Sequence, residues 1–129
     1  MNPAHGMDRK PPRDTRERAF DFACEIVKFC LKLRRVPGCQ SVADQLLRSG
    51  TGLAANAEEA KAAYSRREFA LKNSCALKEG REARFWLRLI IRCHLAVEEE
   101  QAQRLCEEAG ELIGILAATV RSLRRTSIS

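Results

Sequence analysis

Apolar residues recur at steps of three and four along most of this 129-residue chain, a pattern typical of amphipathic helices. The first such segment runs from about Thr15 to Arg35, and Val36-Pro37-Gly38 ends it because proline and glycine interrupt helices. Its buried stripe is expected to consist of Phe20, Ala23, Val27, Cys30 and Leu31.

A second helix is expected after this break, and Ser41 with Asp44 resembles a capping arrangement at its start. Its middle contains Gly50-Thr51-Gly52, where each glycine costs about 1 kcal/mol relative to alanine. The pattern favours close approach of a neighbouring helix at Gly50, with a kink as the alternative. The expected inner face holds Val42, Leu46, Leu53, Ala57 and Ala60.

The remaining two helices have clearer ends. Ser65 and Glu68 form a capping box for a third helix, which continues without proline to about Leu95. A fourth helix opens on Glu98-Glu99-Glu100 and ends in a basic stretch at residues 121–125, both favourable for the helix dipole. Its buried face is expected to hold Leu105, Ala109, Leu112, Leu116, Val120 and Leu123.

Short connections between long amphipathic helices predict neighbours that run in opposite directions. We therefore expect an all-α fold, an antiparallel up-down-up-down four-helix bundle over residues 15–125. Residues 1–14, rich in proline, arginine and lysine, are expected to form a flexible basic arm, and residues 126–129 a disordered tail. We find no internal repeat and no strand pattern in the sequence.

Composition narrows the class of protein. With 45% hydrophobic and 31% charged residues the chain is globular, and it has neither a membrane-length apolar run nor a signal-peptide core, so we expect a cytoplasmic protein. The six cysteines include no Cys-x-x-Cys pair, which favours structural thiols over disulfides or metal. The net charge of +6 permits nucleic-acid binding without proving it.

The third helix has an apolar arc wider than one bundle core requires. On a wheel of about 100° per residue, one side collects Ala76, Ala83, Leu87, Ile90 and His94. Another side collects Phe85, Leu89 and Cys93, with Trp86 between the two. This second side predicts an oligomer interface formed by Phe85, Trp86, Leu89 and Cys93, since aromatic anchors are favoured there. The alternative is an unusually aromatic monomer core.

The rest of that helix carries an arginine row, defined as Arg81, Arg84, Arg88 and Arg92, which share an arc of about 80°. A solvated helix face usually mixes charges, whereas this row contains no acid. It predicts contacts to the phosphates of RNA or DNA without sequence preference. The alternative is internal pairing with acids of an adjacent helix, such as Glu107, Glu108 or Glu111.

The sequence gives little support for a catalytic site. Glu58 and Glu59 on the second helix could face Glu79 and Glu82 on the third, but the Glu-x-x-His pairs of a di-metal bundle site are missing. Cys93 and His94 are adjacent, and adjacent residues point about 100° apart on a helix, which is poor geometry for a nucleophile and its base. We expect no catalytic residue, metal or cofactor, and hence no enzyme.

The same polar residues favour a structural role instead. We expect a polar network that sets helix register, in which side chains of the second helix pair with carboxylates of the third, with Lys78 and Thr51 as further partners. Its members are Arg48, Asn56, Glu59, Glu79 and Glu82.

Several linked motifs carry a family resemblance that covers about residues 19–123. They are Arg48-Ser49-Gly50-Thr51, Asn56-Ala57-Glu58-Glu59-Ala60, Ser65-x-x-Glu68-Phe69, Ala76-Leu77-Lys78-Glu79 and Phe85-Trp86-Leu87-Arg88. The chain resembles the four-helix bundle family encoded in intervening sequences of bacterial 23S ribosomal RNA genes. That family is similar to the accessory variability proteins of diversity-generating retroelements. The chain departs from the pattern at Gly52-Leu53-Ala54, where Ser-Ile-Gly is more usual, and at Gly80, where alanine is commoner.

The resemblance implies a homopentamer, because these proteins form homopentameric barrels. It also implies one of two settings: a protein linked to ribosomal RNA intervening sequences, or an accessory subunit that holds a retroelement reverse transcriptase and its template RNA. We therefore expect a non-enzymatic oligomer that binds nucleic acid or a nucleoprotein partner through its basic surface and does not bind membranes. The alternative is a purely structural protein–protein interaction scaffold without nucleic-acid binding.

Overall fold

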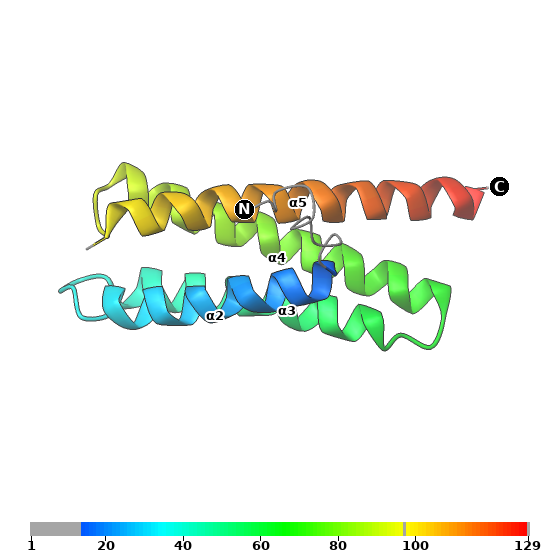
Figure 1. Ribbon diagram of the computed structural model, residues 1–129, viewed down its shortest axis with the longest axis horizontal. Helices are drawn as coiled ribbons and strands as arrows, with labels where there is room; N and C mark the ends of the chain where they lie inside the picture. The colour runs from blue at the N-terminus through cyan, green and yellow to red at the C-terminus, as the bar shows by residue number, and fades with distance from the viewer. Residues whose placement is uncertain (1–13, 97, 129) are drawn as a thin grey trace, which may run out of the picture.

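The computed structural model describes residues 14–96 and 98–128, with side chains described as far as residue 125. Four helices, α2 (Thr15–Leu33), α3 (Gln40–Lys61), α4 (Arg66–Arg92) and α5 (Glu99–Ile128), account for nearly all of these residues, and the described ranges contain no strand (Figure 1). The expected all-α fold with four helices is confirmed. Residues 1–13 of the expected arm and Ser129 lie outside the described residues, while α5 continues past residue 125 to Ile128.

The four helices pack around one core. In Figure 1 the chain runs leftward along α2, returns along α3, runs leftward again along α4 and returns along α5. Each helix packs against the next, and α5 also meets α2, so that α2 and α4 occupy one diagonal of the bundle and α3 and α5 the other. The seam between α2 and α5 is the most sparsely packed of the four.

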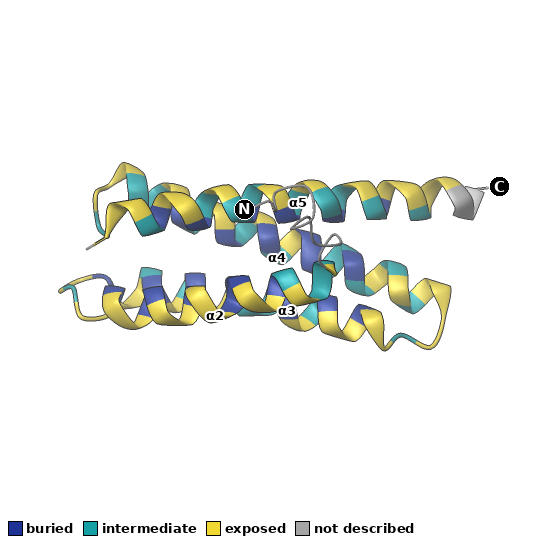
Figure 2. Ribbon diagram, viewed as in Figure 1, coloured by how far each residue is buried: buried dark blue, intermediate teal, exposed yellow. Residues whose placement is uncertain are grey.

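The core follows the apolar pattern closely on α3 and α5 (Figure 2). On α3 the expected inner residues are buried, apart from the half-buried Val42, and on α5 the expected residues are buried apart from the half-buried Leu123. The largest fully buried side chains are Phe22, Ile26, Leu33, Leu46, Leu53, Leu87, Ile90, Leu105, Leu112 and Leu116.

On α2 the expected stripe is wrong in three of its five residues. Phe20 is 62% exposed, Val27 38% and Leu31 60%. The helix buries a different stripe, which consists of Ala19, Phe22, Ala23, Ile26, Phe29, Cys30 and Leu33. Both stripes have helical spacing, because α2 is apolar on two sides, and packing against α3 and α5 selected the side with the larger aromatic content.

The glycines at the middle of α3 permit the close approach expected there. A Cβ atom at Gly50 would lie 2.9 Å from Cγ2 of Ile26 on α2, a separation that packed atoms do not tolerate. A Cβ atom at Gly52 would lie 3.2 Å from the side chain of Glu79 on α4. The helix continues through all three residues, so the neighbouring side chains and not a break explain the glycines.

The helix starts agree with the sequence at α4 but not at α3. The Oγ atom of Ser65 accepts a hydrogen bond from the N–H of Glu68 at 3.0 Å, and Glu68 Oε1 accepts one from the N–H of Tyr64 at 3.0 Å. The expected cap at Ser41 is wrong, since α3 begins at Gln40 with the buried Cys39 at its N-cap and no side-chain cap bond. Because the Cys39 side chain is buried, α3 begins before the position that the polar pattern indicates.

Candidate nucleic-acid interface

The arginine row of α4 faces solvent. Its four members are all exposed, and the part of the chain described by the structure contains no ion pair to any of them. The four residues span about 16 Å along the axis of α4, at about 1.5 Å rise per residue over eleven steps. The Arg84 side chain lies beside Gly110 of α5, where an added Cβ would be 3.7 Å from its Nε atom.

The acids offered as internal partners for this row are largely engaged elsewhere. Glu108 accepts two hydrogen bonds from Arg18 of α2, at 2.6 Å from Nε and 2.8 Å from Nη2, and Glu111 contacts the same guanidinium. These hydrogen bonds raise the pKa of Arg18 above its ordinary value. Because α5 turns these two carboxylates toward α2, they do not neutralise the arginine row on α4.

An apolar groove lies beside the row toward the C-terminal end of α4. It has a volume of about 510 Å³, and its lining consists of Phe85, Arg88, Leu89, Ile91, Arg92 and Cys93. Phe85 is 51% exposed, Leu89 is half-buried and Cys93 is exposed. Three of the four residues expected at an oligomer interface therefore share one open surface with two members of the row.

The fourth expected interface residue, Trp86, has a different position. Its indole packs against the bundle core and meets the Phe85 ring edge to face, with 5.0 Å between the ring centroids. Its Nε1 atom donates a long hydrogen bond of 3.5 Å to Glu82. The half-buried Trp86 ring therefore lies between Phe85 and the core.

The end of α4 differs from the sequence expectation. The helix ends at Arg92, and His94 follows in a turn with φ of 55°, its side chain exposed and Nδ1 3.4 Å from Glu99. Placing His94 on the buried side of the helix was therefore wrong. Glu98 precedes the next helix, and Glu99 and Glu100 lie in its first turn, so the connection turns before them.

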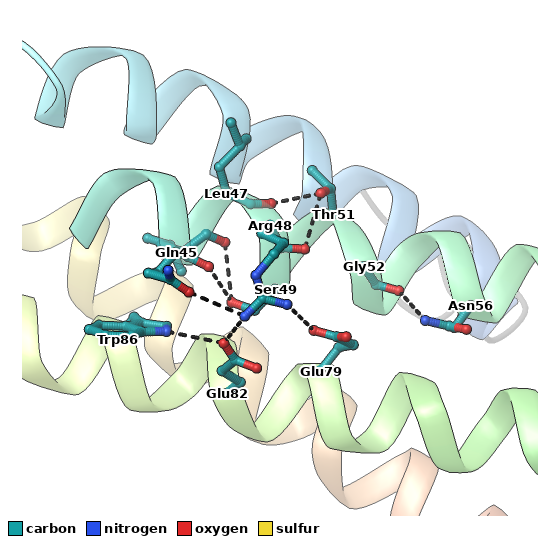
Figure 3. A network of polar contacts seen from close by, with 11 residues as sticks. Gln45, Leu47, Arg48, Ser49, Thr51, Gly52, Asn56, Glu79, Glu82 and Trp86 are labelled. Atoms are coloured by element: carbon teal, nitrogen blue, oxygen red, sulfur yellow. Dashed lines mark hydrogen bonds and ion pairs between the residues drawn. The ribbon is translucent and has the colours of Figure 1, made fainter. Parts of the chain in front are cut away.

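Polar contacts between α3 and α4 centre on Arg48 (Figure 3). Its Nη1 atom lies 3.5 Å from Glu79 Oε1, and Nη2 contacts Glu82 and lies 3.2 Å from Gln45 Oε1. Together with the Trp86 hydrogen bond, this cluster joins the middle of α3 to the base of the exposed surface on α4.

Asn56 and Glu59 lie outside this cluster, contrary to expectation. Asn56 donates to the carbonyl of Gly52 at 2.9 Å, and Glu59 pairs with Lys72. The register explains the difference: from Arg48 to Glu59 along α3, the partner on α4 moves backward from Glu82 to Lys72. Thr51 likewise donates to its own helix, at the carbonyl of Leu47, 2.7 Å away.

The described residues contain no group of three or more histidine, cysteine or acidic side chains that fits a metal ion. All six cysteines are free thiols, and burial raises the pKa of Cys30 to about 12. None of the helices described is long and apolar enough to span a membrane. The arginine row and the groove beside it are therefore the candidate site on the described part of the chain.

These features define a small helical-bundle protein whose distinctive surface combines an arginine row with an apolar groove on one helix. The family model for the 23S rRNA-intervening sequence protein matches residues 14–118, and the chain belongs to that family. It is also similar to the crystal structure of a protein of unknown function from the S23 ribosomal protein family of Bacteroides thetaiotaomicron. The TM-score is 0.77 and the identity 32%, over 83% of this chain and 98% of that one. A search of curated proteins found no match.

Proposed function

We propose that this protein is a non-enzymatic, antiparallel up-down-up-down four-helix bundle that self-associates and binds RNA or DNA through the arginine row of α4. The observation that carries the proposal is the exposure of four aligned arginines, two of whose three expected partners, Glu108 and Glu111, are held by Arg18. Unneutralised guanidinium groups in a line favour a partner with regularly spaced negative charge.

The physics of this surface supports binding to the backbone without base readout. Arginines spaced over about 16 Å of a rod contact successive phosphates and release condensed counterions, so affinity falls steeply with salt. Aromatic side chains that stack on bases are scarce, because Trp86 is tied to the core and Glu82. Repetition of the row in a homo-oligomer, a pentamer by family resemblance, adds weak contacts together.

The description of the family points to RNA of a ribosomal RNA intervening sequence as the first partner class. The resemblance of Phe85-Trp86-Leu87-Arg88 to retroelement accessory proteins supports a second, a reverse transcriptase with its template RNA. Both partners present phosphate backbones to a basic surface, so the same residues serve either role.

The experiment is a fluorescence-anisotropy titration of a duplex and a single-stranded RNA at two or more salt concentrations. Arg84→Glu with Arg88→Glu should weaken binding to every sequence alike. The negative slope of log affinity against log salt should become shallower by about two units, about one per lost phosphate contact. Lys61→Glu with Arg104→Glu is a control that makes the same charge change on exposed residues of α3 and α5 and should alter the slope far less.

Two outcomes contradict the assignment. If the α4 double variant binds as the wild type does, the nucleic acid contacts the N-terminal basic residues or the basic end of α5 instead of the arginine row. Absence of wild-type binding at low salt favours the second candidate, a protein–protein scaffold without nucleic-acid binding. That candidate is supported by the position of Arg88 and Arg92 in the wall of an apolar groove, which suits a protein partner.

A further inference from the structure

The molecule has two separate exposed apolar surfaces with helical spacing. One is the outer α2 stripe, defined as Phe20, Cys24, Val27 and Leu31, which share an arc of about 60° on the side of α2 away from the core. The other is the groove of α4 around Phe85, Leu89 and Cys93. Neither surface is covered by another described part of the chain.

The two surfaces lie on different sides of the bundle. Helices α2 and α4 occupy a diagonal and do not contact each other, and each turns its outer apolar residues away from the core. Within one molecule the α2 stripe therefore cannot cover the α4 groove. A second copy brings the missing surface, since each copy carries one of each kind, and such head-to-tail contacts generate rings or filaments.

The charges beside the two surfaces are complementary. Glu17 and Asp21 flank the α2 stripe at about 50° and 90° from its centre, positions that form interhelical pairs in packed helices. The exposed Lys28 lies between them at about 70°, so this flank carries a net negative charge of one. Arg81, Arg88 and Arg92 flank the centre of the α4 surface at about 60° to 100°, in the opposite rotational sense. The acidic flank of α2 and the arginine flank of α4 lie on opposite rotational sides of their apolar surfaces. Two such flanks come together only when the two helices pack side by side and run in the same direction.

This requirement fits the course of the chain. Both α2 and α4 run leftward in Figure 1, so copies related by rotation about an axis along the bundle present these helices to one another in the same direction. Pairing of α4 with a second α4 in opposite directions instead brings the two arginine rows together, which is repulsive. Pairing of two α2 stripes leaves both grooves empty.

We infer that the outer α2 stripe of one copy packs into the α4 groove of the next, with the helices parallel and with Glu17 and Asp21 beside the arginines that border the groove. This inference rests on the self-association proposed above and names the surfaces that carry it. Two carboxylates set against four guanidinium groups leave the arginine row with a net positive charge, so the assembly keeps its nucleic-acid surface.

The test uses two interface variants of the full chain. Phe20→Glu with Leu31→Glu spoils only the stripe, and Phe85→Glu with Leu89→Glu spoils only the groove. Each variant alone should sediment as a monomer with unchanged helicity, because three of these side chains are exposed and Leu89 is half-buried. Mixed in equal amounts, the two should form a one-to-one heterodimer and nothing larger, since one intact stripe meets one intact groove.

Tyr64→Glu with Ala118→Glu is the control, because both residues are exposed and lie outside the α2 stripe and the outer face of α4, so the wild-type mass should be unchanged. An α2 variant that keeps the wild-type mass overturns the inference, as does a mixture that stays monomeric. A wild-type monomer overturns the self-association itself, while anisotropy measured separately still decides whether the protein binds nucleic acid.

A charge test keeps the inference falsifiable if a stripe or groove variant loses helicity. Glu17→Arg with Asp21→Arg should shift the wild-type assembly toward monomer, and adding Arg81→Glu with Arg88→Glu to the same chain should restore it. Failure of the combined variant to regain the assembly would exclude the proposed contact between these flanks.

Discussion

Gly50 illustrates how much a single residue of this bundle depends on its neighbour. Gly50→Ala should destabilise the protein by about 1–3 kcal/mol, although alanine is the better helix former by about 1 kcal/mol, because the new Cβ atom would lie 2.9 Å from Ile26. Urea denaturation followed by circular dichroism measures the change in the free energy of unfolding.

Gly114 on α5 is the matched control. A Cβ atom there has no neighbour within 4 Å, so Gly114→Ala should stabilise the protein by up to about 1 kcal/mol. Equal effects of the two substitutions would mean that helix propensity, and not the contact with Ile26, explains the glycine at position 50.

Cys30 predicts a loss of stability in alkali. Burial, with a smaller contribution from Asp44, raises the pKa of its thiol from 9.0 to about 12. The unfolded chain therefore releases this proton first, so the stabilising effect is complete below pH 9 and is lost as the pH rises toward 12. The free energy of unfolding should fall across that window, and less steeply in Cys30→Ala.

Thiol labelling provides an independent check of the same residue. A water-soluble thiol reagent at pH 8 should leave Cys30 unmodified in the folded protein. It should modify Cys24 and Cys93, which are exposed in the single chain, quickly in the monomeric interface variants. Rapid labelling of Cys30 without unfolding would contradict its burial.

At the scale of the element, the start of each helix depends on local chemistry that is open to direct test. Ser65→Ala should cost about 1 kcal/mol, because it removes the hydrogen bond from the N–H of Glu68. Ser41→Ala should have little effect, since Ser41 lies inside α3 and no side-chain bond caps that helix. Equal costs in urea denaturation would restore Ser41 as the cap.

The elements show where a single sequence is informative and where it is not. The start of α2 at Thr15 and the capping box at Ser65 follow from local signals, and both agree with the structure. The buried face of α2 does not follow from local signals. Phe20 and Phe22 both belong to apolar stripes with helical spacing, and only the position of the neighbouring helices decides which one is buried. The partner of Glu59 depends in the same way on the register between α3 and α4.

At the scale of the whole molecule, ion pairs help to close the bundle along its most sparsely packed seam, between α2 and α5. Arg18→Met should destabilise the protein by about 1.5–3 kcal/mol, because it leaves Glu108 partly buried without its charged donor. Urea denaturation at pH 7 measures the change in the free energy of unfolding.

Arg104→Met is the control for this seam. Its side chain is 65% exposed and lies 3.8 Å from Glu25, so its removal should change stability by less than about 1 kcal/mol. A cost as large as that of Arg18→Met would indicate that charge along α5, and not the hydrogen bonds of Arg18, closes the bundle.

The sequence by itself determined the number of helices, most of their boundaries and the arginine row, because these depend on periodicity, caps and charge within one segment of chain. Tertiary structure decided which apolar stripe of α2 is buried and which stays outside. It also decided that Arg18 holds Glu108 and Glu111, and so leaves the row on α4 exposed. Such choices depend on which helices become neighbours and in what register, and a pattern within one helix contains no information about its partner.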